Sequence, residues 1–148
     1  MTWKHRIAGP ATAAAALAVL GSAALGLGAC SGDDDDSGVP TLNVELFDWG
    51  IKASPASVAA GDVRVKAKNT GTTEHEVVFV RTDLPEDRLP VKEKKVDEQQ
   101  VEVVGEVEKF AAGKSEKATL ELPAGRYVLI CNIATHYELG MHTVITVQ

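Results

Sequence analysis

Residues 127–147 read YVLICNIATHYELGMHTVITV and consist of two apolar runs joined by a loop of unusual composition. The loop contains a cysteine, a histidine and a methionine, namely Cys131, His136 and Met141, at five-residue spacings. Five residues span roughly 16 Å in a strand and lie about 7.5 Å apart along a helix axis, so neither structure brings the three side chains together. A loop that turns back between two strands can do so, and Gly140 gives it backbone freedom just before Met141.

A thiolate and a thioether in one loop favour copper over zinc, calcium or magnesium, because both sulfur ligands are soft. Two histidines, one cysteine and a weak axial methionine are typical of a blue-copper centre that holds one copper ion. The second histidine must come from another segment, and the remaining candidates after residue 40 are His75 and His142. His142 follows Met141 at the start of a strand, where successive side chains point to opposite faces. We therefore expect His75, in phase with Val77 and Phe79, to be the second histidine ligand.

Each of these residues has a purely structural alternative when it is considered alone. Cys131 could be a core residue at the end of a buried strand, and His75 could be a hydrogen-bonded residue at a strand end. Met141 could simply fill the core. All these alternatives would have to hold together within one short loop and for the upstream histidine as well, so we favour the copper site.

The sequence around this loop predicts an all-β domain that covers residues 41–148. Apolar and polar residues alternate, as in strands with one buried face, over residues 42–46, 63–68 and 117–122. More continuously apolar runs, which indicate strands covered on both faces, occupy residues 77–80, 128–130 and 144–147. Turn signals separate these runs at residues 61–62, 69–71 and 123–125. Six or more short strands at this spacing predict an antiparallel β-sandwich.

Residues 82–100 do not follow this pattern. They are crowded with charges and interrupted by Pro85 and Pro90. We predict a short irregular or helical excursion around 82–100, with a helical turn over residues 91–99.

The loop resembles the ligand loop of the cupredoxins, most closely their sulfocyanin-like and plastocyanin-like branch. The resemblance rests on the residues Cys131-Asn132-Ile133, His136-Tyr137 and Gly140-Met141, and on Asn69-Thr70-Gly71 upstream of His75. It covers about residues 42–148 and implies a Greek-key β-sandwich, copper ligation by His75, Cys131, His136 and Met141, and one-electron transfer.

The sequence departs from that family pattern at two positions. Many blue-copper proteins have an asparagine after the first histidine, and it braces this strand against the cysteine loop. Here the residue is Glu76, so the bracing must be made differently or be absent. The sulfocyanin-like loop often has a glycine before its histidine, whereas this chain has Thr135.

The first forty residues predict export and membrane attachment. Residues 1–29 resemble a lipoprotein signal peptide, because Lys4 and Arg6 precede an apolar segment that ends in Leu27-Gly28-Ala29-Cys30. This ending resembles a bacterial lipobox, in which Cys30 is acylated and anchors the domain to the outer face of the cytoplasmic membrane. An ordinary secretory signal or a retained anchor helix are the alternatives. Residues 30–40, which include four consecutive aspartates, predict an acidic flexible tether.

Composition limits the classes of function. Without Lys4 and Arg6 the chain has 13 basic and 21 acidic residues, and four of the acids lie in the tether, so the domain is near −4. This acidity argues against a nucleic-acid partner. If Cys30 is lipidated, Cys131 has no cysteine left to pair with, and an exported free cysteine requires an explanation such as a metal.

The leading hypothesis is a monomeric electron carrier that is not an enzyme. We expect a redox partner protein, either a cytochrome or a copper oxidase or reductase. It would dock on an apolar patch around the ring edge of His136, made of Ile133, Ala134, Tyr137 and Leu139. Copper storage, delivery or sensing is the alternative, although such proteins favour methionine-rich sites and this chain has one methionine after Met1. A multicopper oxidase needs many more histidines than the three after residue 40.

Overall fold

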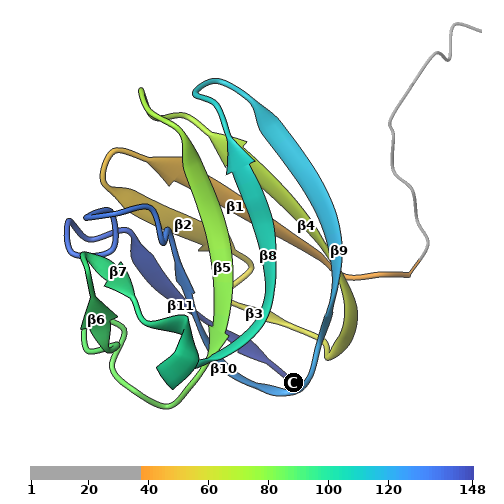
Figure 1. The fold of residues 1–148 in the computed structure, drawn as a ribbon. Helices are drawn as coiled ribbons and strands as arrows, with labels where there is room; N and C mark the ends of the chain where they lie inside the picture. The colour runs from red at the N-terminus through yellow and green to blue at the C-terminus, as the bar shows by residue number, and fades with distance from the viewer. Residues whose placement is uncertain (1–37) are drawn as a thin grey trace, which may run out of the picture. The chain divides into compact units, whose positions relative to one another are not determined.

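The structure is a computed structural model that describes residues 38–148 (Figure 1). The predictions for the signal peptide, for Cys30 and for the tether up to residue 37 lie outside the described residues. Within residues 38–148, no helix is long and apolar enough to cross a membrane.

Two β-sheets face each other and form a sandwich (Figure 1). The first sheet has the order β2 (Gly50–Ser54), β1 (Thr41–Phe47), β4 (Gly61–Asn69) and β9 (Ser115–Leu122). The second has the order β3 (Ser57–Val58), β11 (His142–Val147), β10 (Gly125–Ile130), β5 (His75–Arg81) and β8 (Glu102–Phe110). This architecture confirms the predicted all-β sandwich.

The pairing of strands is mixed rather than wholly antiparallel. Strand β1 runs parallel to β4, and β11 runs parallel to β3, while the other neighbours in the two sheets are antiparallel. Neighbours such as β1 and β4, or β5 and β10, are not consecutive in the chain, which gives the Greek-key-like connections. Because the chain crosses between the sheets, β5 and β10 lie side by side. Strand β5 begins at His75 and β10 ends just before Cys131, so each contributes to the candidate site.

The main core lies between the sheets and comes from the alternating strands. Leu42, Val44 and Leu46 of β1 are buried, whereas Asn43 and Glu45 between them are exposed. Burial of each such aliphatic side chain contributes roughly 1.5–3 kcal/mol, so this alternation fixes which face of each strand turns inward.

A second, smaller core covers the outer face of the second sheet. It joins Val78 and Val80 of β5 and Val128 and Ile130 of β10 to side chains of the connecting segments, namely Leu89, Val96 and Tyr137. Strands β5 and β10 are therefore buried on both faces, as their continuous apolar runs predict. Strand β11 is not, because Thr146 is exposed.

The excursion around residues 82–100 contains a hairpin where the sequence predicted a helical turn. Strands β6 (Val91–Lys92) and β7 (Lys95–Val96) pair antiparallel, and only Glu98–Gln100 form a short 3-10 helix. Glu93 and Lys94 both adopt positive φ, at 52° and 66°, which is the backbone of a tight two-residue hairpin turn. The helical prediction was wrong for residues 91–96, because Val96 is buried in the smaller core and fixes a strand there, whereas the short 3-10 helix at Glu98–Gln100 overlaps the end of the predicted turn.

Candidate metal centre

His75 begins β5 and is completely buried. The preceding loop is shaped by Asn69, whose side-chain amide donates to the carbonyls of Thr73 at 2.8 Å and Phe110 at 3.2 Å. The side-chain oxygen of Asn69 accepts the N–H of Gly71 at 3.0 Å. The Asn69-Thr70-Gly71 turn thus holds the loop that delivers His75 to the end of the sandwich.

The loop between β10 and β11 folds back on itself, as predicted. The N–H of Cys131 donates to the carbonyl of Met141 at 3.1 Å, and the N–H of Met141 donates to the carbonyl of His136 at 3.1 Å. Gly140 has a φ of +111°, so the bend uses the backbone freedom of glycine. These bonds bring the cysteine, histidine and methionine of one loop together.

The donor atoms of three residues converge at this end of the sandwich. His136 Nδ1 lies 3.3 Å from His75 Nδ1 and 3.4 Å from Cys131 Sγ, and His75 Nδ1 lies 3.9 Å from Cys131 Sγ. Donors that share one ion through bonds of about 2.0–2.3 Å lie roughly 3.5 Å apart, so these separations fit a single metal ion.

The burial and the chemistry of the donors fit copper. His75, Cys131 and Met141 are completely buried, and His136 is 8% exposed. Two imidazoles, a thiol and a neighbouring thioether form the soft donor set that copper prefers. Together, the four side chains are positioned for a single copper site.

His142 lies apart from the three converging donors, as its position after Met141 predicted. Its Nδ1 is 3.9 Å from a carboxylate oxygen of Glu86, and its ring lies 5.4 Å from the ring of Tyr137. It is therefore directed toward the smaller core rather than toward Cys131.

The protein environment acts on the protonation of two donors. Burial raises the pKa of the Cys131 thiol, while hydrogen bonds from the backbone of Glu76 and Ile133 act in the opposite direction. Burial also lowers the pKa of His136, followed by the repulsion from His75, which favours the neutral imidazole that can bind a metal.

The prediction that Tyr137 belongs to an exposed docking patch is wrong. Its side chain is buried, its hydroxyl donates to the carbonyl of Glu86 at 2.8 Å, and it accepts the N–H of Leu89 at 2.9 Å. It therefore ties the loop to the 82–100 excursion and is not available to a partner. Of the other predicted patch residues, Leu139 and Ala134 are exposed and Ile133 is partly buried.

Two residues near the donors were not identified from the sequence, Asp48 and Trp49 in the turn between β1 and β2. Asp48 Oδ1 lies 2.8 Å from His75 Nε2. The Trp49 ring is 41% exposed and contacts the ring of His136 edge-on, with 4.8 Å between centroids. The pairing of Phe47 with Gly50 makes these two residues a tight turn, but nothing local indicates a contact with residues 27 or more positions away.

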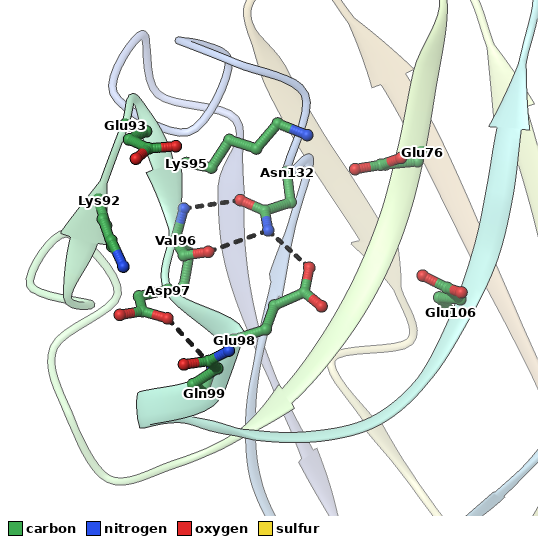
Figure 2. Close-up of a pocket in the computed structure, with 10 residues that line it drawn as sticks. All are labelled: Glu76, Lys92, Glu93, Lys95, Val96, Asp97, Glu98, Gln99, Glu106 and Asn132. Atoms are coloured by element: carbon green, nitrogen blue, oxygen red, sulfur yellow. Dashed lines mark hydrogen bonds between the residues drawn. The ribbon is translucent and has the colours of Figure 1, made fainter.

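Asn132, the residue after Cys131, attaches the cysteine loop to the 82–100 excursion (Figure 2). Its side-chain oxygen accepts the N–H of Val96 at 2.7 Å, and its amide donates to the Val96 carbonyl at 3.1 Å and to a Glu98 carboxylate oxygen at 2.7 Å. The cysteine loop is thereby attached to strand β7.

Beside this link lies a cavity of about 680 Å³ with a largely charged lining (Figure 2). Glu76 and Glu106 point toward it from β5 and β8, and burial raises the pKa of both carboxyls. Its lining includes Glu76 and Asn132, the residues next to two metal donors, but none of the donors themselves.

Comparison with known proteins agrees with this geometry. A family model described as copper binding proteins, plastocyanin/azurin family, matches residues 51–148. The comparison with curated proteins gave no match. The structure resembles that of dithionite-reduced auracyanin from the photosynthetic bacterium Roseiflexus castenholzii, with a TM-score of 0.53 and 24% identity over 73% of this chain and 96% of that one. It also resembles rusticyanin from Thiobacillus ferrooxidans, with a TM-score of 0.54 and 19% identity over 73% and 77% of the two chains.

Proposed function

The chain belongs to the plastocyanin/azurin family of copper-binding proteins, and from this membership we propose that it carries single electrons on one copper ion outside the cytoplasm. The observation that carries the proposal is the convergence of two imidazole nitrogens and one thiol sulfur within 4.8 Å of one another in a buried position. Such a set binds copper in both of its common oxidation states.

We assign the ligands as His75 through Nδ1, Cys131, His136 through Nδ1, and Met141 as a weak axial ligand. The bound copper would accept and release one electron. The residues of the chain would keep the donors in place, because hydrogen bonds and the main core hold both segments that carry them, the loop before β5 and the loop between β10 and β11. A site held in this way changes little when the charge of the ion changes, which favours fast electron exchange.

We infer no enzymatic role for this domain. In the part of the chain that the structure describes, His75, Cys131 and His136 form the group of metal-binding side chains, and His142 lies outside it. The copper ligands are also largely shielded from solvent, so a substrate has little access to the ion.

We also propose that the domain is exported and anchored by a lipid on Cys30, with residues 30–40 as its tether. The lipobox-like ending and the four aspartates support this arrangement. The partner would then be a cytochrome or a copper oxidase or reductase at the outer face of the membrane, and the domain would act as a monomer.

The experiment that tests the function is a visible spectrum after addition of Cu(II) to the purified domain. We expect an intense thiolate-to-copper absorption that disappears on reduction and returns on oxidation. Cys131→Ser should abolish this band while the circular dichroism of the sandwich stays unchanged, because the alternating strands supply the core. A protein that binds only Cu(I) and stays colourless would contradict electron transfer and indicate copper storage or delivery.

A further inference from the structure

Asp48 occupies an unusual position for an acidic residue, beside the most deeply buried histidine of the site. It is the first residue of the turn between β1 and β2, and its Oδ1 lies 2.8 Å from His75 Nε2. The His75 side chain is 0% exposed, and that of Asp48 is 18% exposed. The carboxylate thus contacts the ring nitrogen that faces away from Cys131 and His136.

The orientation of the Asp48 carboxylate is fixed by the loop before β5. Its Oδ2 accepts the N–H of Thr72 at 2.7 Å and the hydroxyl of Thr72 at 2.6 Å. These hydrogen bonds are the main reason that the pKa of Asp48 is lowered to about 2, so the group is an anion at neutral pH.

Gly71 leaves the space for this contact. A Cβ atom at residue 71 would lie 2.5 Å from Asp48 Oδ1 and 2.7 Å from His75 Nε2, closer than carbon approaches either atom. Any side chain at this position would separate the carboxylate from the ring.

A neutral imidazole carries its proton on one nitrogen and can bind a metal only through the other. We propose that Asp48 is a positioning residue: it keeps the proton of His75 on Nε2, leaves Nδ1 free for copper, and through its charge favours Cu(II) over Cu(I). This inference deepens the proposed function and rests on it, since it assigns a partner to one of the four proposed ligands. Residues that bond to the far nitrogen of a ligating histidine fix the tautomer and strengthen the ligand.

Asp48→Asn tests the inference because the side-chain amide of asparagine has an oxygen that accepts and an NH₂ group that donates. The N–H and the hydroxyl of Thr72 both donate to residue 48, so they select which of these two groups faces Thr72. The N–H of Thr72 can only donate, so the amide oxygen should turn toward Thr72 and the amide NH₂ toward His75. The NH₂ group is a donor, so His75 Nε2 must become an acceptor and the proton must move to Nδ1, the atom that should bind copper. Asp62→Asn is the matched control. It removes the same charge at the start of β4, the end opposite to Asn69, where the side chain is exposed.

The first measurement uses the copper-free protein and ¹H–¹⁵N correlation spectra of the histidine rings. We expect the proton of His75 on Nε2 in the wild type and in Asp62→Asn, and on Nδ1 in Asp48→Asn. The second measurement uses copper. Asp48→Asn should bind Cu(I) about 10- to 100-fold more weakly in competition with bicinchoninate, and its reduction potential should move to a more positive value.

If Asp48→Asn keeps the proton on Nε2 and keeps the potential of Asp62→Asn, the inference is overturned. Should Asp48→Asn fail to fold, Asp48→Ala takes its place, because it removes the charge without introducing a donor. Its potential should also rise, and an unchanged potential would again overturn the inference. A wild-type protein without the thiolate-to-copper absorption would contradict the proposed function instead, and the copper-free spectra would still decide where the proton of His75 lies.

Discussion

Met141, the last residue of the loop between β10 and β11, is completely buried, and its carbonyl accepts the N–H of Cys131. Met141→Leu should keep copper bound, because a leucine fills nearly the same space at a cost below about 1.5 kcal/mol. The reduction potential should rise, since a weak donor that favours Cu(II) is lost. Protein-film voltammetry measures this change, and an unchanged potential would mean that Met141 is not an axial ligand.

Thr135 occupies the position where the sulfocyanin-like loop often has glycine, and its φ is +76°. A β-branched residue rarely adopts this conformation, which costs about 1–2 kcal/mol relative to glycine. The backbone is held there by the bond from the N–H of Thr135 to the carbonyl of Lys94 at 2.8 Å.

Thr135→Gly should therefore stabilise the copper-free domain by about 1 kcal/mol, after the greater chain entropy of unfolded glycine is taken into account. Thermal unfolding followed by circular dichroism measures the effect. Thr73→Gly, in the exposed loop before β5, is the control and should not stabilise the domain. A decrease in stability of Thr135→Gly would show that the threonine side chain contributes more than its backbone strain costs.

At the level of secondary-structure elements, Asn132 makes the connection between the cysteine loop and β7. Asn132→Ala removes three hydrogen bonds and leaves the N–H of Val96 buried without its partner. We expect a loss of about 1–3 kcal/mol in the free energy of unfolding and faster release of copper from the loaded protein. Urea unfolding and competition with a chelator measure the two effects.

Asn43→Ala is the matched control for this change. The Asn43 side chain is exposed and makes a long bond of 3.5 Å to the carbonyl of Ser54, so its removal should change stability by less than about 0.5 kcal/mol. Equal effects of the two substitutions would show that Asn132 does not brace the loop.

The strands that sequence patterns predict best are those whose pattern reports burial directly. Leu42, Val44 and Leu46 alternate because one face of β1 meets the core, and Val77 to Val80 are continuously apolar because β5 is covered on both faces. The hairpin at residues 91–96 was missed because its second strand is fixed by Asn132, which lies 36 residues further along the chain.

In the site, too, residues close together in the sequence could be predicted, whereas roles that depend on contacts distant along the chain could not. Cys131, His136 and Met141 could be predicted because they share one short loop, and His75 because few histidines were available. Asp48 and Trp49 could not, since their roles depend on the packing of the β1–β2 turn against segments far along the chain. Tyr137 was assigned to the surface because its neighbours in the sequence do not reveal that the 82–100 excursion covers it.

For the molecule as a whole, the proposed attachment to the membrane would depend on Cys30, which lies outside the described part of the chain. Cys30→Ser should abolish lipid modification and stop processing as a lipoprotein, because the lipid would be attached through the cysteine sulfur, which serine lacks. Metabolic labelling with a radioactive fatty acid and fractionation of cells measure both. Cys131→Ser is the control, since it removes the other cysteine and should leave labelling intact. A soluble wild-type protein cleaved at another site would contradict the lipid anchor and leave only export.

The surface through which electrons leave is also a property of the whole molecule. Electron transfer decays steeply with distance, so a partner must approach the ligand that lies nearest to the solvent. His136 is 8% exposed, whereas His75 is not exposed at all. Two exposed apolar side chains belong to this end of the sandwich: Trp49, whose ring contacts that of His136, is 41% exposed, and Leu139 of the same loop as His136 is 51% exposed. An apolar surface of this kind suits brief contact with a partner.

Leu139→Lys should slow electron exchange with the natural partner several-fold, because a charged side chain must lose its water when the surfaces meet. The visible spectrum should stay almost unchanged, since Leu139 is not a proposed ligand. Leu84→Lys is the matched control. Leu84 is 43% exposed, but its carbonyl accepts from Arg126 at the start of β10, while Cys131 follows the end of that strand. Stopped-flow mixing with the partner measures one rate, and line broadening in partly reduced samples measures self-exchange. If both rates of Leu139→Lys match those of the wild type with copper fully loaded, the electron leaves through another surface, and the charged 82–100 excursion, which includes Leu84, becomes the next candidate.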